Sequence, residues 1–274
     1  MISQVRLGMN SKTNLKFSQF LGWHLGDGCI SITKKYSQYS LTGDITEELL
    51  FYKCVILPCF KIIFPRFISE IKFKKYESSS VCGIYIFDKN FVNYLQDNFG
   101  LVNGKKTDIK VPKFIQTYEQ KKYFLRGLFD TDGSIYFCKS NYKTKKVSLF
   151  SIFHYKPKIK FACISEILIF EVHMFLNELG IRNRIQKPIQ QRKNEFTMHS
   201  VIIDTNKGIN DYLKKIGFSN PKHLTKVSIW EKFGFCPPKT TFHERNLILN
   251  EDLNILNFYN FDYNLDFIKS KLIR

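Results

Sequence analysis

Two aspartates, Asp27 and Asp132, each stand before a glycine at the end of an apolar segment, and they are the first residues in the chain that suggest chemistry. The segments read FLGWHLGDGCISI (residues 20–32) and LRGLFDTDGSIYF (residues 125–137), so the chain is a tandem repeat with an offset of 105 residues. Each predicts a helix that ends near its aspartate and leads directly into a strand. The helix dipole disfavours an acidic side chain in the last turn by roughly 0.3–1 kcal/mol, which suggests that these carboxylates are kept for function.

Small residues recur four apart in both segments, Gly22 and Gly26 in the first and Gly127 and Thr131 in the second. Residues four apart share one face of a helix, and small side chains there let two helix backbones approach closely. Neither segment is long or apolar enough to cross a bilayer. We therefore expect the two helices to pack together and to bring their terminal aspartates side by side, where a carboxylate pair invites a divalent cation.

From about Phe17 to Thr241 the sequence resembles the LAGLIDADG homing endonucleases, in the form that carries both motifs on one chain. LRGLFDTDG is a close match to the motif, and FLGWHLGDG resembles its GDG variant. The resemblance implies an α+β fold with two pseudo-symmetric αββαββα-like halves, packed through paired motif helices, and with saddle-shaped antiparallel sheets on which DNA lies. We expect the halves at residues 1–118 and 119–245, with a tail at 246–274 that packs on the body.

The resemblance also implies a metal site. In this family the acidic residue before each final motif glycine binds Mg²⁺, for which Mn²⁺ substitutes. This assigns Asp27 and Asp132 as catalytic metal ligands, together with the backbone carbonyls of Gly26 and Thr131. Asp130 lies two residues before Asp132, about 200° around a helix, so we expect it to point away from the metal.

A second repeated signal follows each half, FGLVNGKK from Phe99 and IGFSNPKH from Ile216. It pairs Lys105 with Lys222, and members of the resembled family often carry a functional lysine in this region. The two lysines are therefore candidates for stabilising charge in the transition state. Lys106 and Lys110 remain alternatives to Lys105, and a loop lysine can also serve only as a phosphate contact or for solubility.

The family usually has a polar residue, often glutamine, on the strand that leads to the helix after each motif, where it helps to hold metal-bound water. We predict that this position is Asp44 in the first half and Cys163 in the second. Both depart from the usual residue. Cys163 departs further, which leaves open how the second metal position is supported.

The charge of the chain points to a polyanionic partner. Its net charge is +18, with +7 on residues 1–118 and +12 on residues 119–245, while the last 29 residues carry 3 basic and 4 acidic residues. The positive charge thus lies on the repeated halves, which favours a broad surface for double-stranded DNA over a disordered basic arm. A basic but otherwise ordinary soluble surface is the weaker alternative.

Alternating apolar and polar residues after each motif predict strands with one presented face. The first hairpin is expected to turn near residues 34–37, and residues 139–157 are expected to form a longer basic hairpin. A solvated strand face has the same pattern of residues. The interpretation of these faces as DNA-binding therefore rests on the positive charge and the motif. The candidate DNA-binding residues are Ser31, Thr33, Lys35, Gln38, Ser40, Lys72, Lys74, Lys139, Lys143, Lys145, Lys146, Arg182, Arg184, Lys187, Gln190 and Gln191.

The cysteines and histidines indicate no structural disulfide or zinc site. The seven cysteines are odd in number and form no CxxC pair, and the six histidines form no HxH or HxxxH cluster. We find no secretory signal and no transmembrane run, so we expect no membrane partner and an intracellular protein, in the cytoplasm of a prokaryote or in an organelle matrix.

These observations together predict a site-specific, Mg²⁺-dependent double-strand DNA endonuclease that acts as a monomer on a long, asymmetric target. One alternative is an RNA maturase that binds intron RNA with the same scaffold, and another is a catalytically silent DNA-binding regulator. The intact carboxylate pair favours cleavage over both. The chain lacks the leading Cys or Ser and the terminal His-Asn of an intein. We therefore expect a free-standing, intron-encoded protein.

Overall fold

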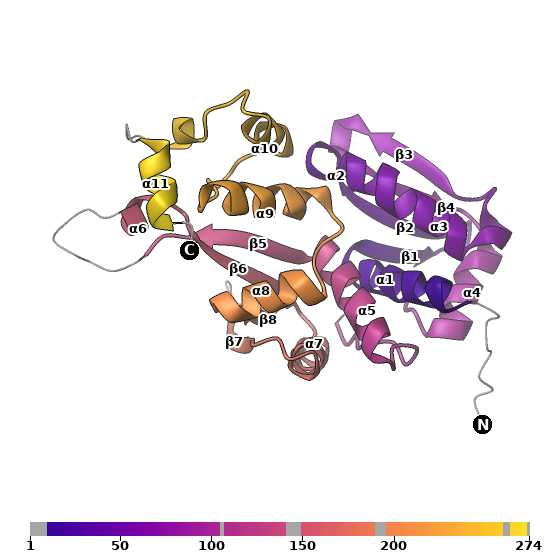
Figure 1. The fold of residues 1–274 in the computed structure, drawn as a ribbon. Helices are drawn as coiled ribbons and strands as arrows, with labels where there is room; N and C mark the ends of the chain where they lie inside the picture. Colours follow the sequence, from indigo (N-terminus) through magenta and orange to yellow (C-terminus); the bar gives the residue numbers. More distant parts are fainter. Residues whose placement is uncertain (1–9, 105–106, 141–148, 190–195, 260–263, 273–274) are drawn as a thin grey trace.

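The computed structural model describes residues 10–104, 107–140, 149–189, 196–259 and 264–272, which form two similar halves around a central pair of helices (Figure 1). The first half comprises α1 (Ser11–Asp27), β1 (Gly28–Ile32), β2 (Ser37–Asp44), α2 (Ile45–Phe51), the π-helix η1 (Tyr52–Ile56), α3 (Leu57–Ile63), β3 (Lys72–Tyr76), β4 (Val81–Ile86) and α4 (Lys89–Phe99). The short 3-10 turns η2 (Pro65–Phe67) and η3 (Glu77–Ser79) flank β3.

The second half repeats this order. It comprises α5 (Tyr118–Thr131), β5 (Gly133–Cys138), α6 (Leu149–Ile152), β6 (Lys156–Cys163), α7 (Glu166–Glu178), β7 (Arg184–Ile189), β8 (Met198–Ile203) and α8 (Asn206–Lys215). The antiparallel sheets have the orders β1-β2-β4-β3 and β5-β6-β8-β7, so each strand of one sheet has a counterpart in the other. The predicted α+β fold with two pseudo-symmetric halves is confirmed.

The motif helices α1 and α5 pack backbone against backbone. A Cβ atom at Gly22 would overlap the carbonyl oxygen of Phe124 and lie 2.6 Å from the amide nitrogen of Leu128. A Cβ atom at Gly127 would overlap the carbonyl oxygen of Gln19 in the same way. The expected role of the small residues is thus seen directly, because no larger side chain fits between these backbones.

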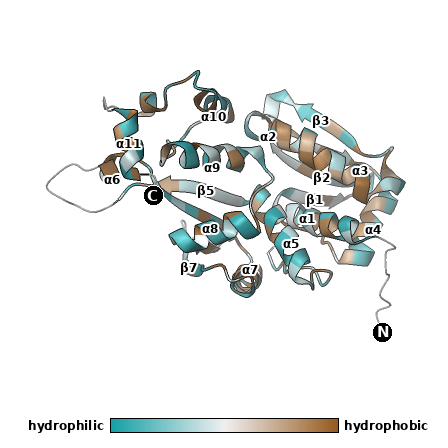
Figure 2. Ribbon diagram, in the orientation of Figure 1, coloured by the Kyte–Doolittle hydropathy of each residue, from teal (hydrophilic) through white to brown (hydrophobic). Residues whose placement is uncertain are grey.

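Aromatic packing fixes α1 in the first half. The ring of Phe64 lies within 6 Å of four other phenylalanine rings, those of Phe17, Phe20, Phe60 and Phe91, with centroid distances of 5.9, 5.0, 5.5 and 4.9 Å. Buried apolar residues from the helices and strands form this core. Figure 2 shows hydrophobic stretches on these elements, in brown. The motif helix therefore has a fixed depth and rotation relative to the sheet.

The hairpin expected at residues 139–157 is wrong in part. Residues 141–148 lie outside the described structure, and Leu149–Ile152 forms the short helix α6 in place of a strand. The reason is packing, since Phe153 is fully buried against the rings of Phe235 and Tyr259, at 4.7 and 4.8 Å between centroids. The β6 strand begins only at Lys156.

Helices after α8 cover the β5 side of the second sheet and reach the first half. They are α9 (Pro221–Phe233), α10 (Phe242–Leu249), the 3-10 helix η4 (Ile255–Phe258) and α11 (Leu265–Leu272). Helix α9 packs against β5, α10 and α11, and also against α2 of the first half (Figure 1). Within the described ranges, no helix is long and apolar enough to cross a membrane.

Candidate active site

Asp27 and Asp132 end the two paired helices and directly precede the first strands of the two sheets. Asp27 is the last residue of α1 and is half-buried, and Asp132 caps α5 and is exposed. A Cβ atom at Gly26 would lie 2.8 Å from the Cβ of Thr131 and 3.3 Å from the amide nitrogen of Asp132. Because the helix ends touch at this point, the two aspartates are neighbours at one end of the shared interface.

The donors available there suit a hard divalent cation. The two aspartate carboxylates and the carbonyl oxygens of Gly26 and Thr131 are oxygen ligands, which Mg²⁺, Mn²⁺ and Ca²⁺ accept. No group of three or more His, Cys, Asp or Glu residues that could hold a metal is found within the described residues. Mg²⁺ commonly binds one or two carboxylates and takes its other ligands from water and substrate phosphates, so a two-carboxylate site fits this cation.

The strand register corrects the pairing of Asp44 with Cys163. Gly28 lies opposite Leu41 in the first sheet, and the equivalent Gly133 lies opposite Phe161 in the second. Counting two residues onward makes Gly43 the counterpart of Cys163. The sequence alone did not reveal this because the first half has one residue fewer between its strand and its helix.

Asp44 has a structural role as the N-cap of α2. Its Oδ1 accepts hydrogen bonds from the backbone of Thr46 at 2.8 Å and of Glu47 at 3.0 Å. Partial burial works to raise the pKa of Asp44, but these hydrogen bonds and the nearby Lys222 ammonium outweigh it and lower the pKa. Asp44 is therefore an ionised helix cap next to the candidate lysine.

Two other side chains fill the space beside Gly43. A Cβ atom at this position would overlap Oε2 of Glu48 and lie 3.1 Å from the hydroxyl of Tyr52. That hydroxyl donates a hydrogen bond of 3.4 Å to Oδ2 of Asp27. Burial, together with the charges of Asp27 and Glu48, raises the pKa of Tyr52 well above its ordinary value, so the hydroxyl keeps its proton. Tyr52 begins the π-helical turn η1, an irregularity often found at functional sites.

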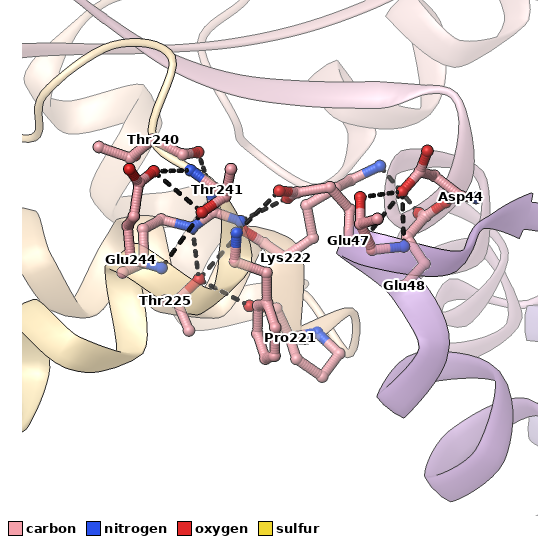
Figure 3. A network of polar contacts seen from close by, with 12 residues as sticks. Asp44, Glu47, Glu48, Pro221, Lys222, Thr225, Thr240, Thr241 and Glu244 are labelled. Atoms are coloured by element: carbon pink, nitrogen blue, oxygen red, sulfur yellow. Dashed lines mark hydrogen bonds and ion pairs between the residues drawn. The ribbon is translucent and has the colours of Figure 1, made fainter. Parts of the chain in front are cut away.

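Glu48 connects this position to Lys222. Its Oε1 accepts hydrogen bonds from Nζ of Lys222 and from Nδ2 of Asn220, both at 2.8 Å, and its Oε2 accepts one from the backbone of Asp44 at 3.1 Å. The carboxylate is buried, with 6% of the side chain exposed. Figure 3 shows Lys222 and Glu48 reaching toward each other from the two halves. One of the two predicted lysines, Lys222, is thus paired with a carboxylate that lies beside Gly43 and Tyr52.

Asp130 fixes the loop that carries Lys222. Its Oδ1 accepts hydrogen bonds from the backbone of Ser219 at 2.7 Å and of Asn220 at 3.0 Å, and Asn220 Nδ2 donates to the Asp130 carbonyl oxygen at 2.9 Å. Complete burial raises the pKa of Asp130 to about 6, against the effect of these hydrogen bonds. The carboxylate of Asp130 therefore faces the loop at Ser219 and Asn220, and Asp130 is a buried structural residue.

A second ion pair crosses between the halves next to the first. Arg245 is 1% exposed, and its guanidinium contacts Oε2 of Glu47 at 2.5 Å. The backbone nitrogen of Phe242 donates to the other oxygen of Glu47 at 2.7 Å. Glu47 therefore anchors α10 to α2, and its neighbour Glu48 anchors Lys222 (Figure 3).

The second half has different residues at the equivalent positions. If the helix caps Asp44 and Ser165 are aligned, Glu48 corresponds to Ile169 and Tyr52 to His173. Ile169 is buried, and His173 Nδ1 lies 2.7 Å from Oδ1 of Asn183. Burial raises the pKa of Cys163 to about 11, and the charge of Asp132 adds to this effect, so Cys163 stays a neutral thiol. Lys105 lies outside the described residues.

The first sheet presents the predicted polar face. Its register places Ser31 opposite Gln38 and sets Ser40 and Lys72 on either side of Tyr85, while the alternate residues such as Tyr39 are buried. Lys74 lies on the same face, and its ammonium is 4.6 Å from the ring centroid of Phe87. Thr33 and Lys35 lie in the exposed turn at residues 33–36.

The second sheet presents a row of lysines that sequence reasoning missed. Lys156, Lys158 and Lys160 alternate along β6 with buried residues, opposite Cys138, Tyr136 and Ser134 of β5. The signal was present as K-x-K-x-K at residues 156–160. Among the predicted contacts, Arg184 is on the face of Lys160 and pairs with Asp204 at 2.7 Å.

The remaining predicted DNA contacts lie next to β5 and β7, at the irregular part of β7, or outside the described residues. Lys139 and Arg182 are exposed next to β5 and β7, and Lys187 lies at the irregular part of β7, where the register does not fix its face. Lys143, Lys145, Lys146, Gln190 and Gln191 lie outside the described residues.

Comparison with known proteins agrees with this geometry. Residues 119–217 match the family of LAGLIDADG-like domains. The fold is similar to that of I-DmoI bound to DNA and manganese, with a TM-score of 0.51 and 17% identity over 75% of this chain and 97% of that one. It is also similar to a point mutant of I-SmaMI, with a TM-score of 0.52 and 12% identity over 94% and 99% of the two chains. The chain therefore has the fold of single-chain proteins with two LAGLIDADG motifs.

A curated relative matches most of the chain by sequence. It is the replication factor C small subunit of Methanocaldococcus jannaschii, 24% identical over 219 residues, which are 79% of this chain. This chain spans only about 10% of that protein's length.

Proposed function

We propose that this chain, which has the double-motif LAGLIDADG fold, is a metal-dependent endonuclease that cleaves double-stranded DNA at one specific site. The observation that carries the proposal is the pair Asp27 and Asp132 at touching helix ends, each directly before a strand of a sheet with a polar or basic face. DNA bound along the two sheets would pass both carboxylates. The structures of I-DmoI with DNA and manganese, and of an I-DmoI variant with its target DNA and 2 mM Mg, support this choice of partner.

In this proposal Asp27 and Asp132 bind Mg²⁺ or Mn²⁺, with the carbonyl oxygens of Gly26 and Thr131 as further ligands. The bound ion supplies Lewis-acid chemistry, polarising the scissile phosphate and lowering the pKa of water. Asp27 is oriented by the hydroxyl of Tyr52, which remains a donor because it stays protonated.

Lys222 adds a fixed positive charge near the place where negative charge develops on the phosphate. Lysines of the two sheets hold the DNA backbone on either side, and polar strand residues contact base edges. Among these contacts, the lysines of β6 and β3 fix the position of the duplex, whereas Gln38 and Ser40 contribute to sequence preference.

We further propose that the protein acts as a monomer on an asymmetric target. Both carboxylates belong to one chain, so a second copy is not needed to complete the site. The two sheet faces differ in their residues, so they read different half-sites. As an intron-encoded enzyme, it would recognise the junction formed when the two flanking exons are joined.

The test is cleavage of that rejoined junction, cloned in a plasmid and incubated with the purified protein and Mg²⁺. We expect one double-strand cut at the junction, with the same cut in Mn²⁺ and none after chelation of the metal. A library of random sequences selected for cleavage serves as a second source of targets. Failure to cut any sequence from either source, with DNA binding intact, would contradict the proposal and favour a binding protein.

A further inference from the structure

Glu48 is a buried carboxylate that the proposed chemistry does not use. Only 6% of its side chain is exposed, and three groups donate to it: the ammonium of Lys222, the amide of Asn220 and the backbone nitrogen of Asp44. One of its oxygens also lies beside Gly43. These contacts come from both halves of the molecule. A buried charge that is paired in this way needs a reason, because it is costly to desolvate.

Stability of the fold does not supply that reason. Replacing a buried ion pair with well-packed apolar residues is often neutral or stabilising. The chain itself shows that its architecture accepts such a residue, since Ile169 is the counterpart of Glu48 in the second half and is 1% exposed. An apolar residue at position 48 would therefore fit the core, but it would not accept the hydrogen bonds from the backbone of Asp44 and the amide of Asn220.

The contacts of Glu48 do give Lys222 one fixed place. The lysine is the second residue of helix α9, far from Glu48 in sequence, and its side chain is a flexible four-carbon stem. Oε1 of Glu48 holds its ammonium at 2.8 Å, and Oε2 of the same carboxylate lies beside Tyr52, whose hydroxyl contacts Asp27. The ammonium is thus linked through Glu48 and Tyr52 to Asp27.

We propose that Glu48 is a positioning residue that acts through Lys222 and serves one of the two strand cuts. This inference rests on the proposed endonuclease function and adds to it. In the second half the counterpart of Glu48 is an isoleucine, which cannot fix a lysine by an ion pair. The strand cut served by the Asp27 side therefore depends on position 48, and the other strand cut does not.

The experiment uses Glu48→Gln, which keeps the side-chain size and an acceptor oxygen but removes the charge that holds Lys222. A cleavable duplex labelled separately on each strand reports the two cuts in single-turnover reactions with Mg²⁺. We expect one strand to be cut about 10–100-fold more slowly, as for a misplaced catalytic group, and the other to change less than about 3-fold. DNA affinity measured in Ca²⁺ should stay within about 3-fold of that of the unmodified protein.

Two further variants separate positioning from structure. In a Lys222→Met background, Glu48→Gln should have no additional effect on either strand, because its action passes through the lysine. Glu47→Gln is the matched structural control, since it breaks the neighbouring ion pair to Arg245. It should lower the melting temperature and leave the ratio of the two strand rates unchanged.

Each outcome has one meaning. If Glu48→Gln slows both strands equally, or still slows cleavage after Lys222 is replaced, the positioning role is wrong and the endonuclease function stands. If the unmodified protein cuts neither strand of any target, it is the proposed function that fails.

Discussion

The two halves share their topology but differ in how they support their aspartates. In the first half, Tyr52 contacts Asp27, and Glu48 holds Lys222. In the second half, the equivalent positions are His173, which is hydrogen-bonded to Asn183 and Asn177, and the buried Ile169. The paired helices and the sheets are thus common to both halves, while the residues behind the carboxylates differ. A pseudo-symmetric fold does not imply two equivalent active sites.

The two halves also differ in how the loop after α4 and the loop after α8 are held. Asp130 binds the backbone of Ser219 and Asn220 and so fixes the loop before Lys222. The repeat offset makes Leu25 its counterpart in the first half, and Leu25 has no side-chain acceptor. The loop of the first half reaches α7 by other contacts, in which the backbone of Val111 donates to Glu171 at 2.6 Å.

The features that the halves share should be the least tolerant of change. We expect Gly22→Ala and Gly127→Ala each to lower the free energy of unfolding by about 3 kcal/mol or more, because a methyl group would meet backbone that cannot move aside. Chemical denaturation measures this. Asn93→Ala, an exposed change within α4, is the control and should be neutral within about 0.5 kcal/mol. A loss at only one of the two glycines would contradict the symmetric helix contact.

The two sheet faces should contribute unequally to DNA affinity. Replacing Lys156, Lys158 and Lys160 with alanine should weaken binding about 100-fold and make the slope of log affinity against log salt shallower by about 2–3. The same change at Lys72 and Lys74 should weaken binding about 10-fold, with a slope change of about 1–2. Salt titrations of binding in Ca²⁺ provide both values. Unchanged slopes would mean that these faces do not contact phosphates.

Asp130 should contribute more to the free energy of unfolding than an exposed acidic residue on the same helix. Asp130→Ala leaves two buried backbone donors without their acceptor, so we expect a loss of about 2–4 kcal/mol in unfolding free energy. Glu119→Ala, which removes a surface pair with Lys122, should cost less than about 0.5 kcal/mol. Equal effects of the two changes would show that the loop is held by other contacts.

The smallest expected effect concerns Tyr52. Its hydrogen bond to Asp27 is long, at 3.4 Å, so Tyr52→Phe should slow the strand cut on the Asp27 side only about 3–10-fold. Tyr39→Phe is the matched control, because its buried hydroxyl has no hydrogen-bond partner among the described residues. The measurement is the rate of cleavage of each DNA strand. Equal rates for Tyr52→Phe and Tyr39→Phe would show that Tyr52 has no role at the site.

Local features of the fold were predictable from sequence, and contacts between distant segments were not. The helix ends at Asp27 and Asp132, the glycine interface and the alternation along β1 and β2 follow from short-range pattern. The role of Glu48 depends on Asn220, which is 172 residues away, and no spacing rule reaches that far. The helix dipole alone explains an acidic residue in the first turn of a helix. The sequence around Glu48 therefore gave no reason to expect its contact with Lys222.

Two other differences between prediction and structure have separate causes. The offset of one residue between Asp44 and its expected counterpart arises from the length of the strand-to-helix connection, which composition does not encode. Helix α6 replaced a predicted strand because Phe153 packs in a cluster with Phe235 and Tyr259 from the C-terminal elements. In this second case tertiary packing decided what the local sequence left open.

The central claim is that Asp27 and Asp132 form one metal-binding active site, and their asparagine variants test it most directly. Asp27→Asn and Asp132→Asn keep the side-chain size and the helix contact but remove a charge that Mg²⁺ requires. Plasmid cleavage in Mg²⁺ should fall by about 100-fold or more in each variant. DNA affinity in Ca²⁺ should be kept or improved, because a negative charge near the phosphates is gone. Full cleavage by either variant would contradict the account.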